Sequence, residues 1–236
     1  FISISREMTR SEIKDYQTAR ALAQDGDAIS LVDYWGGDVD FCFTGVQSEL
    51  EFIAWKLASN AGVLRFTTTT NATYANEFDL DYDVDDDMKQ KTGSDWAQSA
   101  SADIIGDLVS LVKFAKAKGL NPKFAFINQD ELYKICSSEQ IIKACASYLS
   151  NAVGMSQTPD LTQVNGMLAK QAWLNGIQLR VVDQTITREF ADGTSTSGNP
   201  FENSRLILSE TERPGSTQYD ILAESNDLIL RAERSP

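Results

Sequence analysis

An acidic stretch between residues 78 and 87 is the part of this sequence whose residue types could carry chemistry. It reads FDLDYDVDDD and contains six aspartates in ten residues. Carboxylate oxygens are ligands that Mg²⁺ and Ca²⁺ prefer in proteins, so Asp79, Asp81 and Asp83 are candidate metal ligands of a hydrolase. The question is whether these side chains can converge on one ion.

The spacing of these aspartates favours a structural interpretation. Asp79, Asp81, Asp83 and Asp85 alternate with apolar residues, so an extended chain would place the acids in a row on one face. Neighbours in such a row lie about 6.6–7 Å apart, whereas oxygen ligands surround a cation from several directions. We therefore expect residues 78–84 to form a half-buried strand with an acidic edge, which binds cations weakly at most.

Other residue types that enzymes commonly use are missing from the sequence. It contains no histidine, the commonest general base and a frequent metal ligand. It also lacks a P-loop, a GxGxxG motif and a CxxC pair. We therefore expect a protein that is not an enzyme, with no catalytic, cofactor-binding or metal-binding residue and no cofactor.

Cysteine usage indicates the compartment. The three cysteines, Cys42, Cys136 and Cys145, cannot all pair within one chain. We expect free, mostly buried thiols in a reducing, intracellular setting.

Composition and charge define the broad class of protein. The chain has 236 residues, 42% of them hydrophobic, which is enough for a packed core. Its formal net charge of −13 disfavours general attraction to nucleic acids or to anionic membranes. No apolar run approaches the roughly 20 residues that span a bilayer. We expect a globular protein that is not generally attracted to nucleic acid and does not enter a membrane.

Hydrophobic periodicity and capping signals predict an α+β protein, with helices in the middle and strands towards both ends. Helices are predicted over residues 9–24, 47–62, 102–118, from 128 onwards, 139–149 and 163–174. Strands are predicted over residues 28–45 (a strand or hairpin), 63–66, 78–84, 123–127, 177–182, 206–208 and on both sides of 225–227. Residues 191–200 are predicted to form a polar loop.

Aromatic and basic side chains have structural interpretations as well. Four tryptophans are expected to anchor the core or an interface: Trp35, Trp55, Trp96 and Trp173. A stacking platform for nucleic acid is disfavoured because no basic groove accompanies them. Three lysines suit the C-terminus of a helix and need no ligand: Lys113, Lys116 and Lys118.

The order of features in the middle of the chain resembles a known family. Trp96 precedes a helix that starts at Asp103-Ile104, and the turn Gly119-Leu120-Asn121-Pro122 follows. A short strand over 123–127, Asn128 and a helix with Leu132-Tyr133 come next. This order is similar to that of the major capsid proteins of tailed bacteriophages, specifically the lambda-like major capsid protein E family. The similarity extends over residues 47–183, and the helix SELEFIAWKLASNAG takes the place of the family's spine helix.

The resemblance implies an HK97-like capsid fold. Residues 1–100 would form a peripheral subdomain that contains the extended-loop region, the spine helix and an antiparallel sheet. Residues 101–184 would form a central axial subdomain with a mixed sheet and flanking helices. Residues 185–236 would return as C-terminal strands to the peripheral subdomain.

The resemblance also implies a structural function. Copies of the chain would assemble as hexamers and pentamers into the icosahedral head shell of a tailed phage or prophage. The shell would enclose the DNA genome without specific binding, with scaffolding, portal and decoration proteins as further partners. Assembly would occur in the cytoplasm of the bacterial host, and the final location would be the virion capsid.

Two alternatives remain open at this point. One is an encapsulin-like protein compartment with the same fold, which would carry cargo enzyme instead of a genome. The other is a carboxylate-metal-dependent hydrolase that uses residues 79–87.

Overall fold

A computed structural model describes residues 9–22, 31–67, 77–148, 158–174, 176–189 and 194–218. The helices in these ranges are α1 (Arg10–Leu22), α2 (Leu31–Ser59), α3 (Ile104–Ala117), α4 (Gln129–Ser137), α5 (Glu139–Tyr148), α6 (Leu161–Ala169) and the 3₁₀ turn η1 (Asp86–Met88). The strands are β1 (Val63–Phe66), β2 (Phe78–Asp81), β3 (Phe124–Ile127), β4 (Gln178–Val181), β5 (Ile186–Glu189), β6 (Ser195–Gly198) and β7 (Ile207–Ser209). The described chain is therefore a mixed α+β protein, as predicted.

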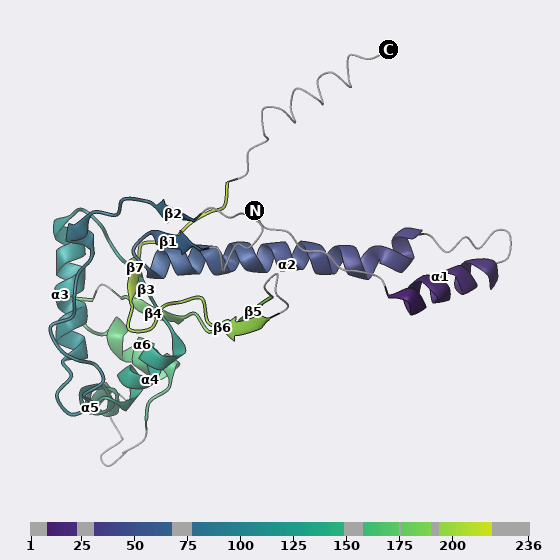
Figure 1. The fold of residues 1–236 in the computed structure, drawn as a ribbon. Helices are drawn as coiled ribbons and strands as arrows, with labels where there is room; N and C mark the ends of the chain where they lie inside the picture. Colours follow the sequence, from purple (N-terminus) through teal and green to yellow (C-terminus); the bar gives the residue numbers. More distant parts are fainter. Residues whose placement is uncertain are drawn as a thin grey trace.

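The longest element is α2, whose 29 residues extend away from the sheets (Figure 1). Its C-terminal part contacts β1 and β5, whereas α1 lies at the opposite end of the helix. The helix ends where the Gly62 amide donates back to the Leu57 carbonyl at 2.8 Å, and Gly62 adopts a positive φ of 81°. This is the glycine-dependent helix end that the sequence predicted.

The prediction of a strand or hairpin over residues 28–45 is wrong for every residue that the structure describes there. Residues 31–45 form the first half of α2, and residues 28–30 lie outside the described ranges. Gly36, Gly37 and Gly45 cost about 1 kcal/mol each relative to alanine inside a helix. The apolar spacing of residues 46–57 continues N-terminally through Val39 and Phe43, so helical periodicity prevails over the glycines.

A three-stranded sheet in the order β4-β3-β7 forms the centre of the globular part. Strand β3 pairs in parallel with β4 and antiparallel with β7. The alternation predicted for residues 177–182 is confirmed, because Ile177 and Leu179 are buried while Gln178 and Arg180 are exposed. Two separate antiparallel pairs, β1-β2 and β5-β6, complete the strands of the described residues.

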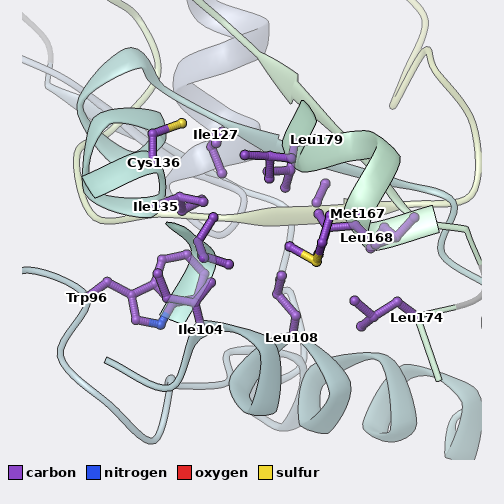
Figure 2. Packing of buried hydrophobic residues seen from close by; sticks show 14 of the residues in the cluster. Trp96, Ile104, Leu108, Ile127, Ile135, Cys136, Met167, Leu168, Leu174 and Leu179 are labelled. Atoms are coloured by element: carbon purple, nitrogen blue, oxygen red, sulfur yellow. The ribbon is translucent and has the colours of Figure 1, made fainter. Parts of the chain in front are cut away.

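The two faces of the central sheet contribute to two different apolar clusters. On one face Ala125, Ile127 and Leu179 pack against side chains of α3, α4, α5 and α6 (Figure 2). On the other face Phe126 packs with Phe201, and the indole of Trp55 from α2 lies 5.4 Å and 6.0 Å from these two rings. Four helices therefore cover one face, and the C-terminal half of α2 lies on the other.

Local capping explains why several predicted helices are confirmed. The Asp103 side chain accepts from the Gly106 amide and starts α3, and the Asn128 side chain accepts from the Glu131 amide and starts α4. The helix predicted over 163–174 instead starts at Leu161, because Asp160 and Gln163 form a capping box, and it ends at Ala169. The helices predicted over 9–24 and 139–149 are confirmed as α1 and α5 over the described residues, and residues 23, 24 and 149 lie outside the described ranges.

The C-terminal region differs from the prediction in one strand. Residues 195–198 form β6 rather than part of a polar loop, because Thr187 and its neighbours in β5 pair with them. The hairpin β5-β6 lies beside α2, whereas β7 pairs with β3 in the central sheet. The strands predicted around 225–227 lie outside the described residues.

Candidate functional site

The first half of the acidic stretch forms a strand, as predicted. Strand β2 pairs antiparallel with β1, and this register places Asp79 opposite Arg65. The Arg65 guanidinium lies 3.5 Å from the Asp79 carboxylate, and both side chains are largely exposed. An exposed pair of this kind contributes little to stability.

The second half of the acidic stretch does not continue the strand, so the prediction of one row of acids through residue 84 is wrong. Asp83 has a positive φ of 51°, and its amide donates to Asp81 Oδ1 at 2.8 Å. The Asp85 side chain accepts from the Asp87 amide at 3.0 Å and caps η1. Aspartate side chains that bond to the backbone two residues on compete with strand pairing, which explains the early end of β2.

The last two aspartates of the stretch are paired with lysines. Lys89 Nζ lies 2.8 Å from Asp86, and this hydrogen bond lowers the pKa of Asp86 and raises that of Lys89. Lys118, which follows the last residue of α3, lies 3.0 Å from Asp87, and this contact raises the pKa of Lys118. Within the described ranges no group of three or more histidine, cysteine, aspartate or glutamate side chains is arranged to hold a metal ion.

Among the described residues, Asp107 is the carboxylate with the most hydrogen bonds to other side chains and amides, and it was not identified as a site residue from the sequence. It is 8% exposed and lies in the first turn of α3. It accepts four hydrogen bonds: from the Gly93 amide at 2.8 Å, the Ser94 amide at 3.1 Å, the Ser94 hydroxyl at 2.6 Å and Trp96 Nε1 at 2.9 Å. Asp107 therefore fastens the segment after the acidic stretch to the start of α3.

These four donors also determine the charge state of Asp107. Burial alone would raise its pKa, but the hydrogen bonds from Ser94, Trp96 and Gly93 outweigh burial and hold the pKa below its ordinary value of 3.8. The group is a carboxylate at neutral pH, and three of its four donors bond to Oδ2 while Gly93 bonds to Oδ1. These bonds hold residues 93–96 against the first turn of α3.

A second buried polar cluster lies at the carboxyl end of β3. The Asn128 side chain caps α4 and donates to Asn203 Oδ1 at 2.6 Å. The buried Glu131 carboxylate accepts from Lys134, which also contacts the Ser204 hydroxyl. The cluster joins α4 to the segment before β7.

The three cysteines are free, as predicted, and Cys136 and Cys145 are buried while Cys42 is half-buried. Burial raises the pKa of the Cys136 thiol. Burial, with a smaller contribution from Cys136, raises the pKa of the Cys145 thiol to about 11. Neither buried thiol has the electropositive surroundings of a nucleophile.

The tryptophans occupy different environments. Trp96 is buried in the main core and Trp55 packs in the second cluster, as expected for anchors. Trp173 is 64% exposed, and Lys113 Nζ lies 4.6 Å from the centre of its ring. The side chain of Trp35 lies outside the described set. Lys113 lies in the second half of α3, as predicted, and its ammonium group also contacts the Trp173 ring.

An exposed apolar surface lies on α2. Val39 and Phe43, about 40° apart around the helix, are 65% and 66% exposed in the half of the helix that extends from the sheets. Exposed large apolar side chains that lie together are typical of protein-protein contact sites. The C-terminal half of the same helix is held by Glu49 and Arg188, whose side chains form two hydrogen bonds of 2.7 and 2.8 Å.

Together, these features define a mixed α+β protein with an exposed apolar helix surface. Among the buried polar side chains described, Ser138 Oγ has no hydrogen-bond partner. Neither the scan against known family models nor the search of curated proteins finds a match for the chain. Among the residues described, no helix combines the length and the hydropathy needed to cross a membrane.

Proposed function

We propose that this chain is the major capsid protein of a tailed phage or prophage and that copies of it assemble into an icosahedral shell with an HK97-like fold. The observation that carries the proposal is α2. A shell subunit needs apolar surface that becomes buried only between copies, and α2 exposes Val39 and Phe43 outside the globular part.

The order of elements supports the same proposal. A long helix leads into the antiparallel pair β1-β2, and a sheet flanked by helices follows. This is the order that the resemblance implies for a spine helix, a peripheral sheet and a central axial subdomain. In this proposal α2 is the spine helix, and it starts at Leu31 rather than at residue 47.

The charge of the chain suits a container for DNA. Its net charge is −13, so the inner surface of a shell would repel the genome rather than bind it. The shell would enclose DNA without specific contacts, form in the cytoplasm of the bacterial host and end as the virion capsid. Hexamers and pentamers of the chain, with scaffolding, portal and decoration proteins, would complete the assembly.

The hydrolase alternative has less support from the geometry. Asp81 and Asp85 accept bonds from the backbone, and Asp86 and Asp87 pair with lysines. A compartment of the encapsulin type would use the same fold and the same subunit contacts, so it differs from a phage head in its cargo.

Electron microscopy of the expressed full chain tests the proposal. The expected result is closed particles of uniform diameter, formed by the chain alone or together with a scaffolding partner. Nucleic acid in the particles would favour the phage head, and packaged enzyme would favour the compartment. A field without closed particles, under conditions in which the chain is folded, would overturn the proposal.

A further inference from the structure

Val39 and Phe43 are the first residues of a regular apolar pattern on α2. The pattern continues into the C-terminal half of the helix. Six apolar residues follow each other at alternating intervals of four and three: Val39, Phe43, Val46, Leu50, Ile53 and Leu57. This alternation is the a/d spacing of a coiled coil, in which the apolar positions form one seam along the helix. We call these six residues the α2 seam.

The α2 seam lies on the side of the helix away from the second core cluster. With 3.6 residues per turn, Trp55 is about 160° around the helix from Val39. Trp55 packs on Phe126 and Phe201, and Phe52, also on that side, lies under the Arg188 guanidinium at 4.5 Å. The globular part of the same chain therefore packs on one side of α2, and the α2 seam lies on the other side.

Exposure changes along the α2 seam. Val39 and Phe43 are about two-thirds exposed, whereas Val46, Leu50, Ile53 and Leu57 are half-buried. A helix with glycines in its first half is marginal in water without packing, because glycine costs about 1 kcal/mol at each helical position. The first half of the seam is therefore the part that most needs a partner.

The α2 seam is symmetric about residue 48, and this symmetry identifies the partner. In an antiparallel pair of identical helices, a positions face d positions, so Val39 would face Leu57, Phe43 would face Ile53, and Val46 would face Leu50 of the second copy. Each exposed residue thus meets a half-buried residue of the other copy. A two-fold contact requires this kind of self-complementary surface.

The helix dipoles favour the antiparallel orientation over the parallel one. A parallel pair would place Asp38 and Asp40 of both copies side by side. The C-terminal half of α2 is acidic as well, because it contains Glu49 and Glu51 but only one base, Lys56. The preference therefore rests on the opposition of the two helix dipoles in an antiparallel pair.

We propose that α2 of one copy packs antiparallel against α2 of a second copy through the α2 seam. This inference rests on the proposed self-assembly and specifies one of its contacts. From Val39 to Leu57 the seam is about 27 Å long, and a helix is about 10 Å wide, so the contact is smaller than a standard interface of about 800 Å² per partner. It is therefore weak alone and becomes strong when repeated within an assembly.

Substitution of Phe43 tests the contact. F43E places a charge opposite Ile53 of the second copy, and it is expected to weaken self-association of the full chain at least about tenfold in sedimentation equilibrium. T44E is the matched control, because Thr44 is exposed on the same helix about 100° from Phe43. T44E is expected to associate like the unchanged chain, and circular dichroism verifies that both variants fold.

Cross-linking tests the orientation independently of any effect on folding. In a C42S background, V39C and L57C variants are mixed and oxidised, and the antiparallel pair is expected to give the mixed 39–57 disulfide. A 39–39 disulfide in V39C alone would overturn the antiparallel arrangement.

The outcomes separate this inference from the proposed function. If the unchanged chain and F43E assemble equally well, the α2 contact is wrong while shell formation stands. If the unchanged chain never associates, both are wrong.

Discussion

The indole N–H of Trp96 donates to Asp107 Oδ2 at 2.9 Å across eleven residues of sequence. This bond links the segment after the acidic stretch to the first turn of α3. Asp87, the last residue of the acidic stretch, pairs with Lys118 at the other end of that helix. The chain between Asp87 and Trp96 is therefore attached to both ends of α3.

Replacing Trp96 by phenylalanine should destabilise the fold. W96F removes one donor from a buried carboxylate, and the expected loss is about 1.5–3 kcal/mol in the free energy of unfolding, measured by urea denaturation. W173F is the control, because Trp173 is mostly exposed, and its effect should stay within about 0.5 kcal/mol. Equal losses in both variants would show that the Asp107 bond contributes nothing specific.

The Asp107 carboxylate should make stability depend on pH. Its pKa in the folded state is below the ordinary value of 3.8, so its contribution is complete well above pH 3.8. The contribution is lost as the pH falls through 3.8 and then through the lower pKa of the folded state.

The D107N variant has no carboxyl group to titrate at this position. Its amide group also cannot accept all the hydrogen bonds that Gly93, Ser94 and Trp96 donate to the carboxylate. The difference in the free energy of unfolding between the unchanged chain and D107N should therefore be largest near neutral pH and should narrow in acid. Urea denaturation at several pH values measures it. A difference that is constant with pH would mean that the charge of Asp107 is irrelevant.

A glycine-to-alanine pair tests the helical conformation of residues 31–45. A Cβ at Gly37 would meet nothing within 4 Å, so G37A should raise the free energy of unfolding by up to about 1 kcal/mol. G62A should lower it by more than about 1 kcal/mol, because Gly62 has a φ of 81° and a Cβ there would lie 2.7 Å from Val84 Cγ2. Thermal unfolding compares the two variants. A destabilising G37A would instead support a turn at Gly36-Gly37, as in a hairpin.

Thiol reactivity should distinguish the three cysteines. At pH 8 a thiol with a pKa of about 11 is ionised in about one molecule in a thousand, so Cys145 should react slowly with iodoacetamide. Cys136 should be slow as well, because burial raises its pKa. We expect Cys42 to be alkylated first, as read by mass spectrometry, and all three to react in urea. Early labelling of Cys145 in the folded chain would contradict the packing around α5.

Local signals predicted much of the helical structure. Asn128 marks the start of α4 locally, because a cap depends on three or four adjacent residues. The predicted start of α3 at residue 102 lies one residue before its cap, Asp103. The start of α6 also has a local signal, because Asp160 and Gln163 have the spacing of a capping box.

Non-local contacts account for the features that could not be predicted. The strand over 195–198 is polar and depends on β5 for its pairing, so no local pattern identifies it. The role of Asp107 depends on donors 11 to 14 residues away. Its one local signal was an acid on the apolar face of a helix, between Ile104 and Leu108.

The central claim of this account is that the chain assembles with itself, and the mass of the purified full chain at rising concentration tests it most directly. We predict that light scattering coupled to size-exclusion chromatography will show conversion from subunits of 26.1 kDa into closed particles of one uniform size. A folded chain that stays at 26.1 kDa at every concentration, alone and with a scaffolding partner, would contradict the claim.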